Sequence, residues 1–381
     1  MMFVTRDRKK VMTDREAYVA FNLISSIGAV TVARLAAASG GSVAQAYARY
    51  PDKRDRDGKE PSWEREMDRA RRQNVTLITL ADPDYPSLLR EIASPPLVLY
   101  VTGSPDVLSE PGVALVGTRT PSAYGRETAG RLAEGLVRRG WHVISGLAMG
   151  IDAAAHRGAL DGGGRTVGVL GGSLDCFYPD ANRGLAREMV AAGGCVVSEF
   201  PFGRNPDVQT FPQRNRIVSG LSRGVVAVEC PLRSGTMITC MRAAEQGRPV
   251  MAVPGRIDWK AAGGCLHLIR EGARLVTGVD DILEDVMELG KTAQPPQTGA
   301  VVRPGRPRPV SVKQPAAAVP EVPLSAEEAR VLRAVPAGGA TRDAVAQAAE
   351  VTAGRVNAVL VALRIKGRVR FCSGNRVELV S

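Results

Sequence analysis

The sequence predicts an α/β protein whose largest domain is built on a doubly wound, mostly parallel sheet. Two observations carry this prediction: short continuous runs of valine and other apolar residues recur through the middle of the chain, and helical patterns separate them. Continuous apolar runs indicate strands that are covered on both faces. Alternation with helices indicates parallel strands joined by crossover helices.

Seven short strands are expected, and they fall at 113–116, 142–144, 167–170, 195–197, 225–228, 250–253 and 274–276. The helices expected between and after them fall at 125–139, 151–160, 182–192, 235–246, 263–272 and 279–289. This order of elements makes the sheet the scaffold of the chain. Any site should therefore be sought at an edge of that sheet.

A small or glycine-rich turn follows six of the expected strands, in the strings VGTR, SGLAMG, LGGS, SEFPFG, VECPLRSGT and VPG. In open α/β sheets the carboxyl ends of the strands form the ligand crevice. Glycine lets ligand oxygens approach backbone N–H groups, and the following helix adds a positive N-terminus. The need for short turns alone accounts for one or two such glycines. Six turns favour a phosphate-binding crevice.

Composition divides the chain into four expected parts. Residues 1–74 contain a helix, Gly28 and a second helix, as in small SAM-like or helix-hairpin-helix bundles. Such bundles either contact DNA backbone or serve only as structural helices. Residues 75–290 hold the sheet. Residues 291–323 contain eight prolines and form a linker, because they cannot bury a core.

Residues 324–381 read as three helices followed by a two-stranded hairpin, which indicates a winged helix. Ser325 and Glu328 have the spacing of a capping box at the first helix. If this unit reads duplex DNA, its third helix would make the contacts. The candidate residues there are Arg355, Asn357, Arg364 and Lys366. The alternative is a protein-interaction module that does not contact DNA.

The net charge of +11 lies in the flanks, because residues 75–290 hold 21 basic and 23 acidic residues. A broad basic face is therefore not available on the sheet domain, and polyanion binding there would depend on a few placed arginines. The six cysteines form no CxxC pair, which is typical of reduced thiols. No apolar run of ~18 residues and no secretory leader is present, so we expect a cytoplasmic protein without membrane contact.

Motifs of common enzyme classes are missing from the sequence. It contains no GxGxxG after the first strand, no GxxxxGK[ST], no HExxH and no GxSxG. We therefore expect no cofactor, no metal and no catalytic residue. His156 lies in a helical pattern, where a packing role is a simpler interpretation than a catalytic role.

Arginines do occur at the expected crevice. Arg119 follows the first strand, and Arg214 and Arg216 flank Asn215 in FPQRNR, which begins with Phe211. Arginine beside an aromatic ring, on loops with free backbone N–H groups, suits phosphate contact with base stacking. That combination is typical of single-stranded nucleic-acid sites. For each arginine alone, a surface ion pair is the competing interpretation.

The middle of the chain resembles the DprA (Smf) family of bacterial DNA-processing proteins. The strings that carry the resemblance are YPSLL (85–89), PPLVLY (95–100), VGTRTPSAYG (116–125), SGLAMGIDAAAHRGAL (145–160), LGGSLDCFYPDAN (170–182), FPQRNRIVSGLS (211–222), VECPLRSGTMIT (228–239) and AEQGRPVMAVPG (244–255). They cover roughly residues 80–285 and keep their order. The helical N-terminal part and the winged-helix-like C-terminal part match the family's usual layout.

The resemblance implies an extended Rossmann-like domain that binds single-stranded DNA and is not an enzyme. It also implies a homodimer that loads the RecA recombinase onto incoming DNA in natural transformation, displacing single-strand-binding protein. The DNA-binding residues carried over are Gly117, Thr118, Arg119, Gly146, Phe211, Arg214, Asn215 and Arg216. Family members often have a basic residue beside SGLA, where this chain has Leu147-Ala148-Met149, so one positive contact of the family's pocket is not matched here. We place the dimer interface near Val250, Leu266 and Ile269.

Two other functions remain open on the sequence. Glu229 followed by Ser234-Gly235-Thr236 loosely resembles the PGGxGT phosphate loops of phosphoribohydrolases, which would make the chain a nucleotide-processing enzyme. The winged helix alone would suit a regulator that binds duplex DNA.

Overall fold

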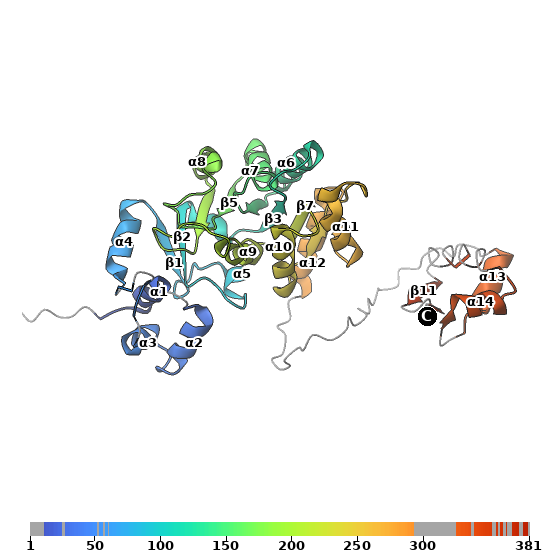
Figure 1. Cartoon of the computed structure of the whole chain (residues 1–381), viewed down its shortest axis with the longest axis horizontal. Coiled ribbons are helices and arrows are strands. Elements are labelled where there is room, and N and C mark those ends of the chain that lie inside the picture. Colours follow the sequence, from blue (N-terminus) through green and yellow to red (C-terminus); the bar gives the residue numbers. More distant parts are fainter. Residues whose placement is uncertain are drawn as a thin grey trace, which may run out of the picture. The chain divides into compact units, whose positions relative to one another are not determined.

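The computed structural model describes residues 11–24, 27–51, 53–55, 58–59, 61–292, 325–336, 339–352, 356, 359–360, 363, 368–372 and 376–379. The chain divides into two compact units, Met1–Pro296 and Gln297–Ser381, which we describe separately. Figure 1 shows the elements of each. No helix within the described residues is both long and apolar enough to cross a membrane.

The first unit is built on a nine-stranded sheet whose order is β1-β2-β6-β5-β4-β3-β7-β8-β9. The seven expected strands are confirmed as β3 (Gly112–Gly117), β4 (His142–Ser145), β5 (Thr166–Val169), β6 (Cys195–Ser198), β7 (Val225–Glu229), β8 (Val250–Ala252) and β9 (Arg274–Leu275). All of these pair in parallel. The chain runs outward from β3 to β6, then returns to the other side of β3 at β7. That reversal places the topological switch point between β3 and β7.

Two strands that we did not expect extend the sheet beyond β6. They are β1 (Thr76–Thr79) and β2 (Val98–Gly103), and both pair antiparallel. The fold is therefore a mostly parallel sheet with an antiparallel end. This end lies away from the switch point.

Helices cover both faces of the sheet, as a doubly wound fold requires. One face packs against α6 (Ala123–Arg138), α7 (Ile151–Asp161) and α12 (Val279–Thr292). The other packs against α5 (Ser87–Arg90), α9 (Thr210–Leu221), α10 (Gly235–Glu245) and α11 (Gly263–Arg270). A separate apolar cluster joins α8 (Arg183–Ala191) to β6. Short 3₁₀ turns complete the unit at Pro105–Ser109, Asp180–Asn182 and Lys260–Ala262.

Helix α9 corrects our expectation that FPQRNR forms a loop. The segment looks polar in the sequence, but its buried residues recur at helical spacing. Thr210, Arg214, Ile217 and Leu221 are all buried on one side of the helix. Pro212 lies in the first turn, where backbone N–H groups have no intrahelical partner, so the proline costs no hydrogen bond. The segment therefore presents one face of a rigid helix to the crevice.

Among the described residues before the sheet there are four helices: α1 (Asp14–Leu23), α2 (Ala29–Ala37), α3 (Val43–Arg49) and α4 (Trp63–Arg72). Thr13 and Glu16 form a capping box at the start of α1. The apolar core of these helices also contains Val98 and Tyr100 of β2, and the Tyr100 hydroxyl donates to Glu66 of α4 at 2.9 Å. The helices and the antiparallel strands thus share a core, and a boundary at residue 74 stays a prediction.

The second unit holds a three-stranded sheet of order β10-β12-β11 and two described helices. Its elements are α13 (Ala326–Arg333), β10 (Ala340–Thr341), α14 (Arg342–Ala348), β11 (Val369–Cys372) and β12 (Arg376–Leu379). Ser325 and Glu328 form the expected capping box. The candidate duplex contacts Arg355, Asn357, Arg364 and Lys366 lie outside the described residues, as do residues 293–323 of the expected linker.

Candidate nucleic-acid interface

A cavity of about 300 Å³ opens at the switch point, where the carboxyl ends of the parallel strands meet. We call it the crevice. The loop after β3, the turn after β4, one face of α9 and the N-terminus of α10 line it. This is the edge at which open α/β sheets bind ligands. Seven of the eight residues that we predicted for DNA binding line it: Gly117, Thr118, Arg119, Gly146, Phe211, Arg214 and Asn215.

Arg216 is the predicted residue that the structure places elsewhere. Residues 211, 214, 215 and 218 recur at helical spacing and share the face of α9 that lines the crevice. Arg216 lies on a different face, where its guanidinium pairs with Glu199 at 2.5 Å and its side chain is 19% exposed. Our expectation for Arg216 assumed a loop, in which residue spacing does not determine which side chains point the same way. As a helical residue, Arg216 links α9 to Glu199, the residue that follows β6.

Arg214 is buried beneath the crevice. It is 5% exposed, and its Nη1 donates to the Val169 carbonyl at 2.5 Å. Burial lowers the pKa of this guanidinium, and the nearby Asp152 carboxylate offsets part of that effect. A Cβ atom at position 146 would collide with the guanidinium, so any residue other than glycine there would have to displace the Arg214 side chain. Arg214 therefore shapes the floor of the crevice.

Asp152 is a crevice residue that our sequence analysis missed. Its carboxylate accepts hydrogen bonds from the backbone N–H groups of Gly146 at 3.1 Å and Ala148 at 3.3 Å. Burial raises the pKa of Asp152, while Arg214 and these donors counteract the rise. The pair of buried charges fixes the turn after β4. The acidic residue in the first turn of α7 was the signal that could have revealed it.

Arg119 and Phe211 form the exposed part of the crevice. The guanidinium carbon of Arg119 lies 5.0 Å from the centroid of the Phe211 ring, a cation–π contact. Phe211 is partly buried, and its ring centroid lies 6.3 Å from that of Tyr178. Arg119 is exposed, and the described residues contain no carboxylate within ion-pair distance of it. Arg119 is thus available to an anionic ligand.

The N-terminus of α10 supplies further anion-binding groups. Ser234 is the N-cap residue, and Ser234, Gly235 and Thr236 all line the crevice. The Ser234 hydroxyl oxygen is buried without a hydrogen-bond partner among the described residues. A helix N-terminus carries free N–H groups and a partial positive charge, which favours phosphate. We noticed this string in the sequence but did not assign it to the DNA site.

Two candidate catalytic groups lie outside the crevice. The Glu229 carboxylate accepts hydrogen bonds from the Ser122 hydroxyl and the Trp259 indole N–H, and it does not line the crevice. His156 is fully buried, and its Nδ1 lies 2.7 Å from Thr166 Oγ1. Burial lowers the pKa of His156 to about 3, so the ring is neutral. His156 therefore packs inside the fold, as the simpler interpretation predicted.

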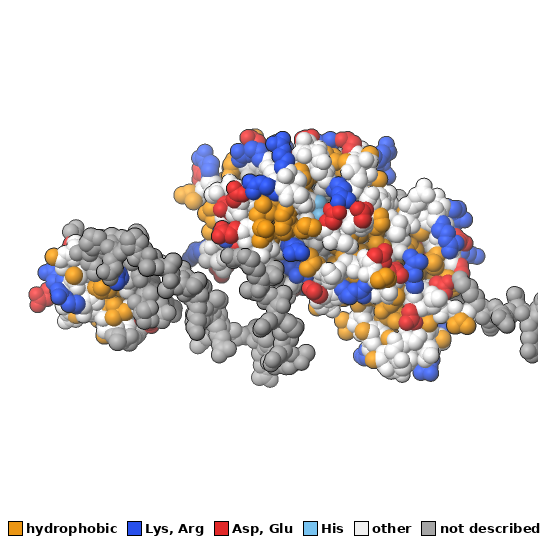
Figure 2. Space-filling view, turned by 180° about the vertical axis from the view of Figure 1, so that it is seen from behind, with side chains coloured by type: hydrophobic (Ala, Val, Ile, Leu, Met, Phe, Trp, Pro, Cys, Tyr) orange, Lys and Arg blue, Asp and Glu red, His pale blue; other side chains and the backbone are white. Residues whose placement is uncertain are grey.

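The residues predicted for a dimer interface lie near the β8–β9 end of the sheet, in β8 and α11. Val250 and Ile269 are partly buried against the core, and Leu266 of α11 is partly exposed. The neighbouring edge strand β9 presents Leu275, which is 43% exposed. The interface stays a prediction. Basic and acidic side chains alternate over the visible face of the first unit, without one continuous basic surface (Figure 2).

Comparison with known proteins gives two family models that match the sequence. The model of DNA recombination-mediator protein A matches residues 76–287, and that of the DprA winged helix domain matches residues 315–375. The protein Smf of Synechocystis is 43% identical over 221 residues. That match covers 57% of this chain and 55% of the relative, so it spans about half the length of the curated protein.

Two solved structures are similar to the fold. The X-ray structure of DprA from Streptococcus pneumoniae matches with a TM-score of 0.60 and 34% identity, over 72% of this chain and 98% of that one. DNA processing protein A from Helicobacter pylori, whose structure describes a single-stranded DNA binding mode, matches with a TM-score of 0.50 and 28% identity. It covers 56% of this chain and 96% of that one.

Proposed function

This chain belongs to the DprA (Smf) family of DNA recombination mediators, and from that membership we propose that it binds single-stranded DNA in the crevice. The supporting observation is the combination of phosphate donors with an aromatic ring at one sheet edge. Arg119, Ser234 and the N-terminus of α10 would bind phosphate oxygens. Phe211 offers an apolar ring beside them, on which a base would stack.

We assign the other predicted residues supporting roles in the same proposal. Gly117 and Gly146 keep side chains away from the crevice floor, and Thr118 and Asn215 line it with polar atoms. Arg214 and Asp152 hold the floor in place from below. Binding of this kind would tolerate any base sequence, because the groups address the sugar–phosphate backbone and the ring faces of bases.

The wider role that we propose is recombination mediation in natural transformation. In this proposal the protein is a homodimer that loads the RecA recombinase onto single strands and displaces single-strand-binding protein. The family name and the single-strand-binding relative from Helicobacter pylori support it. We also propose that the chain is not an enzyme, because the crevice carboxylate of Asp152 is engaged with backbone N–H groups. The division into parts 1–74, 75–290, 291–323 and 324–381 belongs to this proposal.

The proposal is tested by fluorescence anisotropy with a labelled oligothymidylate and with a duplex of matched length. We expect the full chain to bind the single strand more tightly than the duplex. Equal or tighter binding to the duplex would contradict the proposal and would move DNA binding to the winged helix. Incubation with AMP or CMP, followed by chromatography, should release no free base. Release of base would instead support the phosphoribohydrolase alternative.

A further inference from the structure

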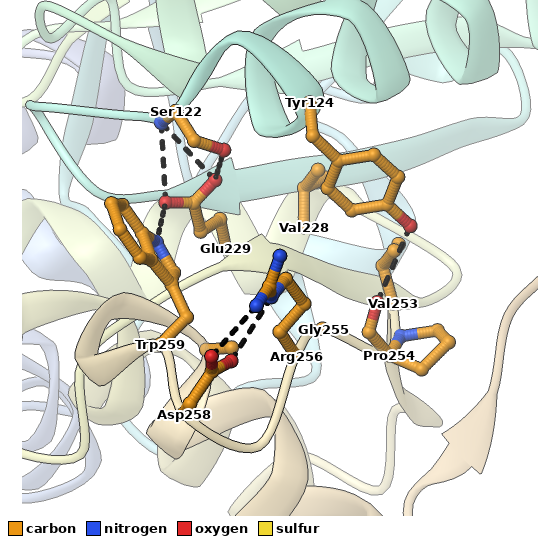
Figure 3. Close-up of a pocket in the computed structure, with 11 residues that line it drawn as sticks. Ser122, Tyr124, Val228, Glu229, Val253, Pro254, Gly255, Arg256, Asp258 and Trp259 are labelled. Carbon is orange, nitrogen blue, oxygen red and sulfur yellow. Dashed lines mark hydrogen bonds and ion pairs between the residues drawn. The ribbon is translucent and has the colours of Figure 1, made fainter.

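A second and larger cavity lies beside the crevice and has no role in the function proposed so far. Its volume is about 760 Å³. It is bounded by the start of α6, the carboxyl ends of β7 and β8, and the loop that follows β8 (Figure 3). Its floor is apolar, since Val228 and Val253 are both buried. We call it the aromatic cavity.

Two aromatic rings form its walls. Trp259 is 50% exposed and Tyr124 is 53% exposed, and Figure 3 shows them on opposite sides of the cavity. Each ring is held by its polar end: the Trp259 indole N–H donates to Glu229 Oε1 at 3.2 Å, and the Tyr124 hydroxyl donates to the Pro254 carbonyl at 3.3 Å. Rings that are fixed in place and still half-exposed can take up a flat partner at little entropic cost.

Glu229 is the residue that positions Trp259. It is only 4% exposed, so its carboxylate must be hydrogen-bonded. The Ser122 hydroxyl donates to it at 2.6 Å and the Ser122 backbone N–H at 3.2 Å, in addition to the indole. A side chain at position 125 would collide with this carboxylate, and the residue there is Gly125. The buried carboxylate thus ties the indole to the N-terminus of α6.

One short loop contributes a residue to each of the two cavities. Thr118 lines the crevice, and Ser122 lines the aromatic cavity. The Thr118 backbone N–H donates to the Glu229 carbonyl at 2.7 Å, so the strand end that anchors this loop also carries the carboxylate that holds Trp259. A strand bound in the crevice would reach the aromatic cavity by crossing residues 118–122.

Arg256 stands at the mouth of the aromatic cavity. Its side chain is 81% exposed and pairs with Asp258, which is 63% exposed, at 2.7 Å. Figure 3 places its guanidinium between the two rings. An ion pair this exposed contributes little stability, so the guanidinium can exchange Asp258 for a phosphate at small cost.

We propose that the aromatic cavity is a second base subsite, which takes a nucleobase of the bound single strand between Trp259 and Tyr124. Arg256 contacts the phosphate that joins this nucleotide to its neighbour. The proposal rests on single-strand binding in the crevice and extends the bound strand beyond it. Nucleobases also occur in free nucleotides, so the test includes both sources.

The direct test makes Trp259 the fluorescent reporter. The chain has three tryptophans, and the double variant Trp63→Phe/Trp141→Phe leaves Trp259 alone. Stacking of a base on the indole should quench its emission when oligothymidylate is added. Thymidine monophosphate at the same nucleotide concentration should quench it far less. Equal quenching by the mononucleotide would assign the cavity to a free nucleotide and overturn the proposal.

Single substitutions in the otherwise unchanged chain give an independent readout. Trp259→Ala should weaken oligothymidylate binding about 5- to 150-fold, the range for one stacked base. Trp259→Phe should retain most of the affinity, because a ring remains. Tyr124→Phe is the matched control for Tyr124→Ala, since it keeps the ring and removes only the bond to Pro254. Thermal melting of each variant shows whether it is folded.

The outcomes separate this proposal from the proposed function. If the unchanged chain does not bind oligothymidylate, single-strand binding fails, and the subsite fails with it. A second case is that the unchanged chain binds and Arg119→Ala weakens binding, but folded Trp259→Ala binds as well as the unchanged chain. If, in addition, oligothymidylate does not quench the Trp63→Phe/Trp141→Phe reporter variant, only the subsite is wrong. Sedimentation covers a third case: if Trp259→Ala loses affinity only together with a change of oligomeric state, the cavity serves contact between copies and the proposal is overturned.

Discussion

The loop of residues 118–122 contributes to both the crevice and the aromatic cavity, but different kinds of groups line the two. The crevice presents hydrogen-bond donors: Arg119, the N-terminus of α10 and the Ser234 hydroxyl, which has no partner in the part of the chain that the structure describes. The aromatic cavity presents two half-exposed rings over an apolar floor. The first suits phosphate and the second suits a base. If both cavities bind the strand as we propose, charge and stacking would act at two separate places.

A second contrast lies within the crevice, between a buried and an exposed arginine. Arg214 is 5% exposed and hydrogen-bonded to the backbone, whereas Arg119 is exposed over Phe211. Both came from the same sequence argument. The structure gives them different surroundings: Arg214 is buried against the backbone of the fold, and Arg119 is exposed at the surface of the crevice.

Arg214→Ala should have the largest effect, and that effect should be on stability. It removes a donor to Val169 and leaves the buried Asp152 carboxylate without its neighbouring positive charge. We expect a loss of about 3 kcal/mol in the free energy of unfolding, measured by urea denaturation. Unchanged stability together with lost DNA affinity would show that Arg214 is a ligand contact and would remove the contrast with Arg119.

Arg119→Ala should leave the free energy of unfolding unchanged and weaken oligothymidylate binding about 10- to 100-fold, the scale of one charge-assisted hydrogen bond. Anisotropy titration measures the affinity. Arg126→Ala offers a matched control, because Arg126 is an exposed arginine that does not line the crevice. Equal affinities for Arg119→Ala and the unchanged chain would refute the assignment.

Phe211→Ala should have a smaller effect, which separates stacking from packing. The ring is partly buried and lies under Arg119, so its loss removes a stacking platform and frees the guanidinium. We expect about a 10-fold weaker affinity for oligothymidylate and oligodeoxyadenylate alike, because stacking tolerates any base. Phe211→Tyr should bind nearly as well as the unchanged chain. A large drop in melting temperature for Phe211→Ala would instead place the ring in the core.

Ser234→Ala should give the smallest change. Its hydroxyl is buried without a partner among the described residues, and a phosphate would satisfy it. Loss of one neutral donor should weaken binding about 3- to 10-fold. Stability should stay the same or rise slightly, because the free protein loses an unsatisfied polar group. Reduced stability without reduced affinity would show that the hydroxyl serves the helix alone.

The sequence was sufficient to predict the parallel part of the sheet, because an apolar run such as Val225–Glu229 suits a buried strand and is too short for a typical helix. It also located the crevice, since the carboxyl ends of parallel strands must meet. It could not predict α9, because FPQRNR is mostly polar and its buried arginine looks like a surface residue in the sequence. Without that helix, the direction in which the Arg216 side chain points could not be predicted. The aromatic cavity was missed because Tyr124 and Trp259 are far apart in the sequence and meet only through the fold around Glu229.

The salt dependence of oligothymidylate affinity tests the central claim most directly, because it distinguishes charge from stacking in one experiment. Log K against log salt is measured for the full chain, Arg119→Ala, Trp259→Ala and the chain ending at Pro296. We predict that Arg119→Ala has a slope shallower by about 0.7, since one phosphate contact is lost. Trp259→Ala should run parallel to the unchanged chain at lower affinity. The chain ending at Pro296 should be shallower than the full chain if the basic residues after it contact DNA. An Arg119→Ala line with the slope and position of the unchanged chain would contradict the claim that the crevice binds the phosphates of single-stranded DNA.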